Sequence, residues 1–248
     1  MSGHFTPPPL LSEVVAAHGG LDRWAAVRRL SLHVRVGGNV LALRLQSPRI
    51  RSLSVSVETQ RIHATLDPFP RPGLIGHFNR QHVRIETRDE ARIVAQRDLQ
   101  RSADGKVMRR LVWDDLDLLY FLGYALWNYA VTPFVFLWTG FECREGAPLR
   151  ESNGTVLRSL DVIYPHAFPA HSRNQRFYFD DAGLLRRIEY SAEVFGDWAR
   201  AVHECDSHRA FDGLVIPRHR VVFARARRGH PLRFLKLMEG WIDHAAAD

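Results

Sequence analysis

The sequence predicts an α+β fold in which one strongly curved antiparallel sheet, a half-barrel or open barrel, has helices filling its concave face. Three observations favour this fold. Apolar and polar residues alternate over short segments in both halves of the chain, which is typical of strands with one buried face. Between these halves, residues 118–141 contain no acidic or basic side chain. No internal repeat or low-complexity linker interrupts the pattern, so we expect a single domain over residues 1–248, with a helical insert at about 113–138.

Two short helices are expected before the first strand. Prolines at 7–9 end an extended leader and place a helix start at Leu10. The glycine pair at 19–20 ends that helix, because glycine readily adopts a left-handed cap. A second helix is predicted over residues 21–28.

The apolar period changes from near 3.6 to 2 at Leu30, which marks the first strand. Residues 37–39, Gly-Gly-Asn, are expected to form a hairpin turn. The loop at 67–76 is rich in proline and glycine, so it cannot be the interior of a strand or helix and is expected to rim an opening. The strands predicted in this half lie at residues 30–36, 41–45, 53–57, 62–66, 83–85 and 93–95.

The central segment at 118–141 is long enough to cross a bilayer, since about 20 apolar residues span the hydrocarbon core. A span there would divide one sheet between two sides of a membrane, and Gly123 and Pro133 interrupt the segment. We therefore predict a helical hairpin buried against the sheet and no integral membrane span. Attachment to a membrane through this segment is kept as a further alternative.

Strands resume after Gly140, where period-two alternation returns. Both halves together give about eleven to thirteen strands, counted from the alternating segments. The strands predicted in the second half lie at residues 141–144, 156–164, 175–179, 184–190, 200–205, 214–223 and 234–242.

The formal charge of +7 comes from 34 Lys+Arg against 27 Asp+Glu, and nearly all of the excess is arginine. Dispersed basic residues predict a solvated outer sheet face and no nucleic-acid partner. Arginine would also suit an anionic head group or a carboxylate on a ligand. The alternating basic positions include Arg44, Arg61, Arg84, Arg92, Arg176 and Arg220.

Two features bear on the cellular compartment. Cys143 and Cys205 fit neither a disulfide framework nor a metal knuckle, and a single disulfide between them stays open. Residues 1–20 lack the charged and apolar regions of a signal peptide, so we expect a cytoplasmic protein.

The densest polar cluster is the sequence HECDSH at 203–208. On a strand, His203 and Cys205 would share one face and the remaining acidic residues and His208 the other. No second ligand cluster has matching spacing, so no metal site is predicted. The chain also lacks a G-x-S-x-G motif, a P-loop and a dinucleotide glycine motif, and no cofactor is predicted.

The candidate ligand-binding residues are Tyr120, Tyr124, Trp127 and Asn128, which fall on one stripe of the central helix. They combine flat apolar surface with donors that can orient a ligand carbonyl. The alternative, that this stripe belongs to the core with its hydroxyls satisfied, stays open.

The candidate catalytic residues are His166, His171 and Asp114. The two histidines bracket a loop containing two prolines, and histidine titrates near neutrality. Asp114 precedes the central helix, and a carboxylate at the mouth of an apolar cavity would have a raised pKa. The alternatives are a loop histidine bonded to backbone and an aspartate that caps the helix.

Four segments carry a resemblance to a known family: AAHGGLDRWAAVRRLSL, WDDLDLLYFLGYALWNY, HSRNQRFYFDDAGLLRRIEY and FDGLVIPRHRVVFAR. They resemble a little-characterised bacterial family that is similar to the lipoprotein carrier LolA and receptor LolB. The resemblance implies a half-barrel closed by helices and a cavity that accepts acyl chains or other apolar molecules. It implies no catalytic residues, and this chain lacks the lipobox cysteine of exported carriers.

The predicted function is therefore binding of an apolar or amphipathic small molecule inside the half-barrel, by a cofactor-independent cyclase or isomerase. Such catalysis depends mainly on a shaped cavity that holds the reacting ends together. The alternative is a non-catalytic carrier of lipid or another hydrophobic ligand. The sequence gives no prediction of the oligomeric state.

Overall fold

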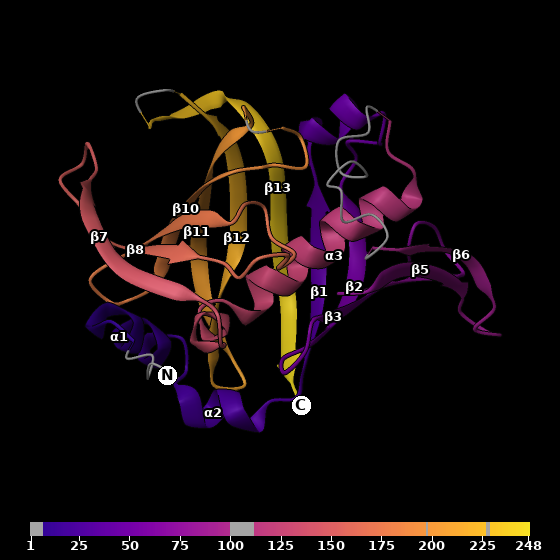
Figure 1. Ribbon diagram of the computed structural model, residues 1–248, viewed down its shortest axis with the longest axis horizontal. Coiled ribbons are helices and arrows are strands. Elements are labelled where there is room, and N and C mark those ends of the chain that lie inside the picture. The colour runs from indigo at the N-terminus through magenta and orange to yellow at the C-terminus, as the bar shows by residue number, and fades with distance from the viewer. Residues whose placement is uncertain (1–6, 100–111, 197, 227–228) are drawn as a thin grey trace.

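The computed structural model describes residues 7–99, 112–196, 198–226 and 229–248. Over these residues the strands form one antiparallel sheet of thirteen, in the order β6-β5-β4-β3-β2-β1-β13-β12-β11-β10-β9-β8-β7. The edge strands β6 and β7 do not pair with each other, so the sheet is open, and it curves around the helix α3 (Figure 1). The predicted fold class, a curved antiparallel sheet with a few helices, is confirmed.

Most strands in the first half of the chain follow the predicted alternation, but β4 was not predicted and begins inside the loop expected at 67–76. They are β1 (Arg29–Gly37), β2 (Arg51–Glu58), β3 (His63–Asp67), β4 (Leu74–Asn79), β5 (His82–Thr87) and β6 (Ile93–Asp98).

The strands in the second half extend further than the sequence predicted, above all at the carboxyl end of the chain. They are β7 (Glu142–Arg150), β8 (Val156–Ile163), β9 (Asn174–Phe179), β10 (Leu185–Ser191), β11 (Arg200–Phe211), β12 (Leu214–Arg225) and β13 (Pro231–Ala247).

The two halves of the sheet join through their first and last strands. β1 pairs with β13 from Leu30 opposite Ala247 to Gly37 opposite Glu239. On its other side β1 pairs with β2. Because β1 and β13 lie at the centre of the sheet, inner residues from both ends of the chain face the same space.

Residues 41–45 were predicted as a strand after a hairpin turn, and this prediction was wrong. They belong to the 3-10 helix η1 (Asn39–Arg44). Leu41 and Arg44 are buried whereas Leu43 is 57% exposed, which is helical rather than strand spacing. The alternation of three leucines in the sequence imitates the period of a strand.

The helix α3 (Asp115–Val131) lies along the concave face of the sheet (Figure 1). It begins with a capping box, in which Asp114 accepts a hydrogen bond from the Asp117 N–H at 2.9 Å and Asp117 accepts from the Asp114 N–H at 3.2 Å. Among the described residues, no helix is long and apolar enough to cross a membrane.

The predicted helical hairpin is wrong in its second arm. α3 ends before Pro133, and only the short 3-10 helix η3 (Phe134–Leu137) follows it. Proline supplies no N–H to continue the helix, and the chain then enters β7 directly. The segment is nevertheless buried against the sheet, as predicted, since Phe134, Val135 and Phe136 are all buried.

Two short helices close one end of the half-barrel: α1 (Pro9–Ala17) and α2 (Leu21–Ala26). The backbone N–H of Leu10 donates to Glu145 of β7 at 2.9 Å. Trp24 of α2 stacks on Phe134, with ring centroids 4.2 Å apart and planes inclined by 4°. The predicted helix at 21–28 is two residues shorter, because Val27 is already extended.

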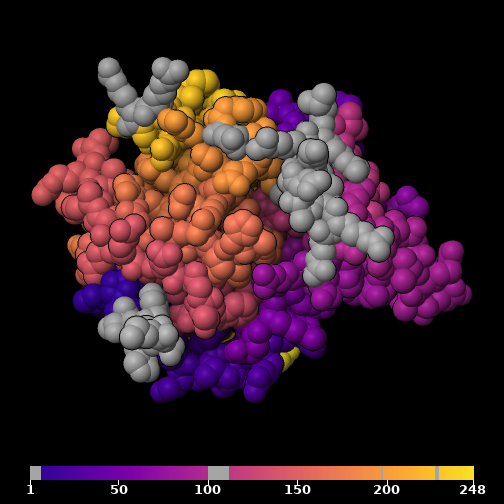
Figure 2. Space-filling model, viewed as in Figure 1, coloured from indigo at the N-terminus to yellow at the C-terminus, as the bar shows by residue number. Residues whose placement is uncertain are grey.

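The apolar core lies between the inner face of the sheet and α3. Inner residues of β1 to β5, such as Val55, Leu66 and Phe78, are buried with the helix side chains that face them. In the space-filling view the β4–β6 edge, in purple and magenta, projects from the body (Figure 2). The projecting β6 is mostly exposed, so the core thins toward this edge.

Candidate functional site

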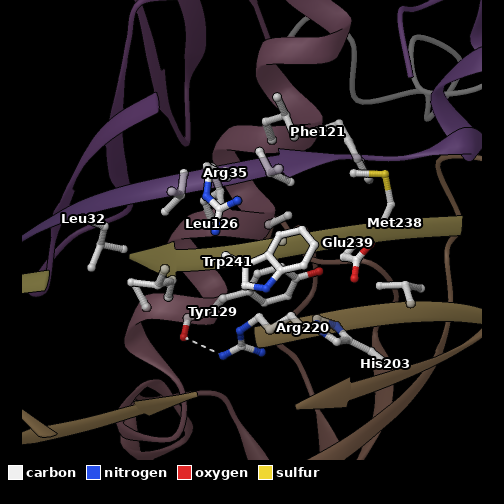
Figure 3. A pocket seen from close by; sticks show the side chains of 18 of the residues that line it. Leu32, Arg35, Phe121, Leu126, Tyr129, His203, Arg220, Met238, Glu239 and Trp241 are labelled. Carbon is white, nitrogen blue, oxygen red and sulfur yellow. Dashed lines mark hydrogen bonds between the residues drawn. The ribbon is translucent and has the colours of Figure 1, made fainter. Parts of the chain in front are cut away.

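A cavity lies between α3 and the inner face of β1, β11, β12 and β13 (Figure 3). About 720 Å³ of this region is free of protein atoms, a figure that includes the open solvent at the mouth of the cavity. Strand alternation at the centre of the sheet and the curvature around α3 create this space.

The wall of the cavity is mainly apolar. On α3 the lining positions recur three and four residues apart, so they form one stripe along the helix. On the sheet they alternate with outward residues. The apolar lining consists of Leu32, Val34, Val36, Val222, Met238 and Ile242 from strands and Phe121, Leu122, Ala125, Leu126 and Ala130 from α3.

One end of the cavity carries a hydrogen-bonded group of aromatic side chains centred on His171. The Tyr129 hydroxyl lies 2.7 Å from Nε2 of His171 and the Tyr124 hydroxyl lies 3.1 Å from Nδ1. Tyr190 stacks on the imidazole, with centroids 4.3 Å apart and planes inclined by 7°. Burial lowers the pKa of His171 to about 3, so the ring is neutral at physiological pH. One ring nitrogen then donates to a tyrosine and the other accepts.

Arg220 of β12 brings the cavity a buried positive charge. Arg220 is 6% exposed, and its Cζ atom lies 4.7 Å from the centroid of the Tyr129 ring. The guanidinium donates to Sγ of Cys205 at 3.2 Å. It also donates to the carbonyl of Tyr129 at 3.4 Å (Figure 3). Within the described parts of the chain, no carboxylate forms an ion pair with it.

His203 of β11 lines the cavity beside these groups. It is 1% exposed, and its ring meets the Tyr129 ring edge to face, with centroids 4.8 Å apart. Neither ring nitrogen has a hydrogen-bond partner among the described residues. Burial and the Arg220 charge hold the pKa of His203 well below its ordinary value, so this imidazole is also neutral.

Three further residues border the cavity, although their strand positions belong to the outer face of the sheet: Arg35, Glu239 and Trp241. Arg35 pairs with Asp243 at 2.7 Å, and its guanidinium lies 5.1 Å from the Trp241 ring. Glu239 pairs with Lys236 and, at 3.1 Å, with His219. The charges of Arg35 and Glu239 are therefore neutralised outside the cavity.

The predicted ligand-binding residues lie on the neighbouring stripe of α3 and do not line this cavity. Trp127 donates from Nε1 to the carbonyls of Glu58 and Arg61, at 2.9 and 3.1 Å. Asn128 donates to the carbonyls of Tyr124 and Pro169, both at 2.8 Å. Tyr124 and Trp127 are fully buried, and the partly buried Tyr120 packs on Phe78 and Tyr124. Their role as ligand contacts stays a prediction.

The three predicted catalytic residues do not come together. His171 lies at the cavity, as described above. His166 lies on an exposed loop, and neither it nor Asp114 is among the lining residues. Asp114 caps α3 and pairs with Arg97, which holds the pKa of this carboxyl below its ordinary value rather than above it. The expected raised pKa of Asp114 was therefore wrong, because the guanidinium and the helix backbone stabilise the charged form.

The polar cluster at 203–208 divides between the two faces of β11, as strand geometry predicts. His203 and Cys205 point inward, and Asp206 reaches His219 on the outer face at 3.1 Å. Among the described residues no group of three potential ligands could hold a metal ion. Cys143 and Cys205 are both buried free thiols.

The site residues predicted from the sequence did not include Arg220 or Tyr129. Arg220 was assigned to the solvated outer face together with Arg44, and both assignments were wrong because both side chains are buried. Arg44 donates to the carbonyls of Val194 and Phe195, at 3.2 and 3.1 Å. Arg220 precedes the buried Val222 by two positions, and this spacing on one strand face was the available indication.

The comparisons with known proteins concern the fold. No protein-family model matches the chain, and no curated protein matches it. A DUF1329 family protein from Desulfovibrio piger superposes with a TM-score of 0.54 at 10% sequence identity, covering 96% of this chain and 92% of that one. A LolA superfamily protein from Nitrosomonas europaea superposes with a TM-score of 0.51 at 7% identity, covering 92% and 91%. The chain therefore has the LolA-like fold that its sequence resemblance implied.

Proposed function

We propose that this protein binds an apolar or amphipathic small molecule in the cavity between α3 and the sheet, as a non-catalytic carrier. The observation that carries the proposal is the cavity itself, whose wall is formed by apolar side chains from the three strands β1, β12 and β13 and from the helix α3. Apolar surface on a ligand gains about 25 cal/mol per Å² when it leaves water for such a wall.

The fold supports the same proposal. The sequence resemblance to LolA and LolB implies a cavity for acyl chains, and the cavity of this chain lies between helix and sheet, where that resemblance places it. At 10% and 7% identity the solved structures share the fold with this chain, and its own lining residues determine the ligand.

A carrier fits the polar groups better than the cyclase or isomerase that the sequence suggested first. A general base works best with a pKa near the operating pH, and burial lowers the pKa of His171 to about 3. Tyr124 and Tyr129 are poor bases and acids at neutral pH, because burial raises both pKa values. The polar end of the cavity is thus suited to hydrogen bonding rather than to proton exchange.

The proposal is tested by titrating the purified protein with the neutral fluorescent probe N-phenyl-1-naphthylamine and displacing it with dodecan-1-ol. One saturable site per chain, emptied competitively by the alcohol, is the expected result. Absence of saturable binding by both compounds would contradict the proposal. Native mass spectrometry of protein extracted from cells then identifies any ligand that copurifies.

A further inference from the structure

We infer that the ligand is an amphipathic carboxylic acid, whose carboxylate is bound by Arg220 and His203 and whose apolar tail lies along α3. The inference rests on the proposed function, because it assigns the chemistry of the molecule that the cavity takes. It follows from two buried side chains that line the same cavity. Among the described residues, Arg220 has no carboxylate partner for its charge, and the ring nitrogens of His203 have no hydrogen-bond partner.

The first observation is the unmatched charge of Arg220. A guanidinium has five N–H donors. Among the described residues, those of Arg220 reach only a thiol sulfur and one distant carbonyl, and its Nε has no partner. Two other buried arginines also have an Nε without a partner among the described residues, but their remaining donors are better satisfied. Arg187 pairs with Glu189, and Arg44, which has no carboxylate partner there either, donates to two carbonyls at 3.1 and 3.2 Å. A buried cation without a counter-ion is unfavourable, and a bound anion would remove that penalty.

Neighbouring groups do not neutralise Arg220. Burial raises the pKa of the Cys205 thiol, so its contact with the guanidinium is with a neutral sulfur. Glu239 on the adjacent strand β13 is engaged by Lys236 and His219. Glu204 of β11 pairs with Arg233 on the outer face, at 2.8 Å. The carboxylate that Arg220 requires is therefore expected from the ligand.

The second observation is His203, whose two ring nitrogens are buried without partners. On paired strands Cys205 lies opposite Arg220 and His203 lies opposite Val222, so His203 and Arg220 share the inner face two residues apart in register. A neutral imidazole offers one N–H donor. Together the two side chains present donors to one anion, and each would gain the partner it lacks.

The charge and shape of the Arg220 guanidinium favour a carboxylate over a phosphate group. A planar guanidinium matches the two oxygens of a carboxylate in a bidentate pair. Only one net positive charge is available among the described lining residues, since Arg35 is paired with Asp243, and one charge suits a monoanion better than a doubly charged phosphate ester. The apolar wall formed by Val34, Ala125 and Leu126 accounts for the tail.

The test compares dodecanoate with dodecan-1-ol, two ligands with the same tail, by isothermal titration at neutral pH. The wild-type protein is expected to bind dodecanoate at least about tenfold more tightly than the alcohol. Arg220→Met should lose this preference while keeping its affinity for dodecan-1-ol. Arg187→Met removes a buried arginine away from the cavity and should keep the preference.

The wild-type comparison decides the inference even if Arg220→Met fails to fold. Equal binding of both ligands by the wild type, or an unchanged preference in folded Arg220→Met, would overturn the carboxylate assignment and leave the proposed function intact. Failure of both ligands to bind the wild type would instead contradict the proposed function. A weaker preference in His203→Phe is expected, because only one of the two donors is lost.

Discussion

Gly123 of α3 rests directly on Phe78 of β4: a Cβ at position 123 would lie 2.5 Å from Cβ and 2.6 Å from Cγ of that phenylalanine. This contact sets how closely the helix approaches the sheet. Gly123→Ala is expected to lower the free energy of unfolding by about 1–3 kcal/mol, the usual effect of overpacking. Chemical denaturation measures the loss, and it should shrink in a Phe78→Ala background, which removes the Cγ contact. An equal loss in both backgrounds would show that the contact is not responsible.

Trp127→Phe separates a core role from a ligand role for the stripe predicted from the sequence. The substitution removes the indole donor to the carbonyls of Glu58 and Arg61. We expect the free energy of unfolding to fall by about 1–3 kcal/mol, because the buried indole no longer donates to these two carbonyls. The affinity of the folded protein for dodecan-1-ol should stay unchanged. If Trp127→Phe lost binding while its stability stayed unchanged, Trp127 would be a ligand contact rather than a core residue.

The buried histidines predict that stability falls in mild acid. Burial lowers the pKa of His171 to about 3 and of His208 to about 4, and holds the pKa of His203 far below its ordinary value. The unfolded chain takes up these protons near pH 6.5, so stability is complete above that pH and is lost as the pH falls.

The measurement for this prediction is denaturant unfolding at pH 7.0 and pH 5.5. Each buried histidine should contribute a loss of about 1 kcal/mol over this interval. His171→Phe is less stable at both pH values but should show a smaller difference between them. A pH difference as large as that of the wild type would contradict the assignment to His171.

Arg220→Met should leave the stability of the unliganded protein unchanged or raise it. Methionine fills much of the same volume, and replacing an uncompensated buried charge by an apolar side chain is neutral or stabilising by about 1–4 kcal/mol. Arg187→Met breaks a pair with Glu189 and should instead lower the melting temperature. A loss of several kcal/mol in Arg220→Met would indicate that the protein itself satisfies this guanidinium.

Much of the fold could be predicted because strand alternation is a local property. The run from Leu30 to Val36 alternates in the sequence and forms β1, with Leu30, Leu32 and Val34 buried. The same rule failed at Leu41 and Leu43, where a 3-10 helix of six residues is too short to reveal its period.

The site was harder to predict because its residues meet only through tertiary structure. Val34 of β1 pairs with Ile242 of β13 although the two residues are far apart in the sequence. No local sequence pattern predicts that pairing. Two adjacent stripes of α3 are equally apolar, so the sequence could not decide whether Tyr124 or Tyr129 would border the cavity. The burial of Arg220 could not be predicted, because it depends on the curvature of the whole sheet and not on the neighbouring residues in the sequence.

The most direct test of the ligand cavity is to fill it. Ala125 of α3 lines the cavity and is 4% exposed, so Ala125→Phe would place an aromatic ring in the space proposed for the ligand. Ala25→Phe, on the exposed side of α2, is the matched control.

Isothermal titration of dodecan-1-ol into the wild type and both variants gives the decisive measurement, with circular dichroism to establish folding. We predict one-site binding by the wild type and by Ala25→Phe, and binding at least about tenfold weaker by folded Ala125→Phe. Unchanged binding by Ala125→Phe would contradict the account, because the ligand would then occupy some other part of the molecule.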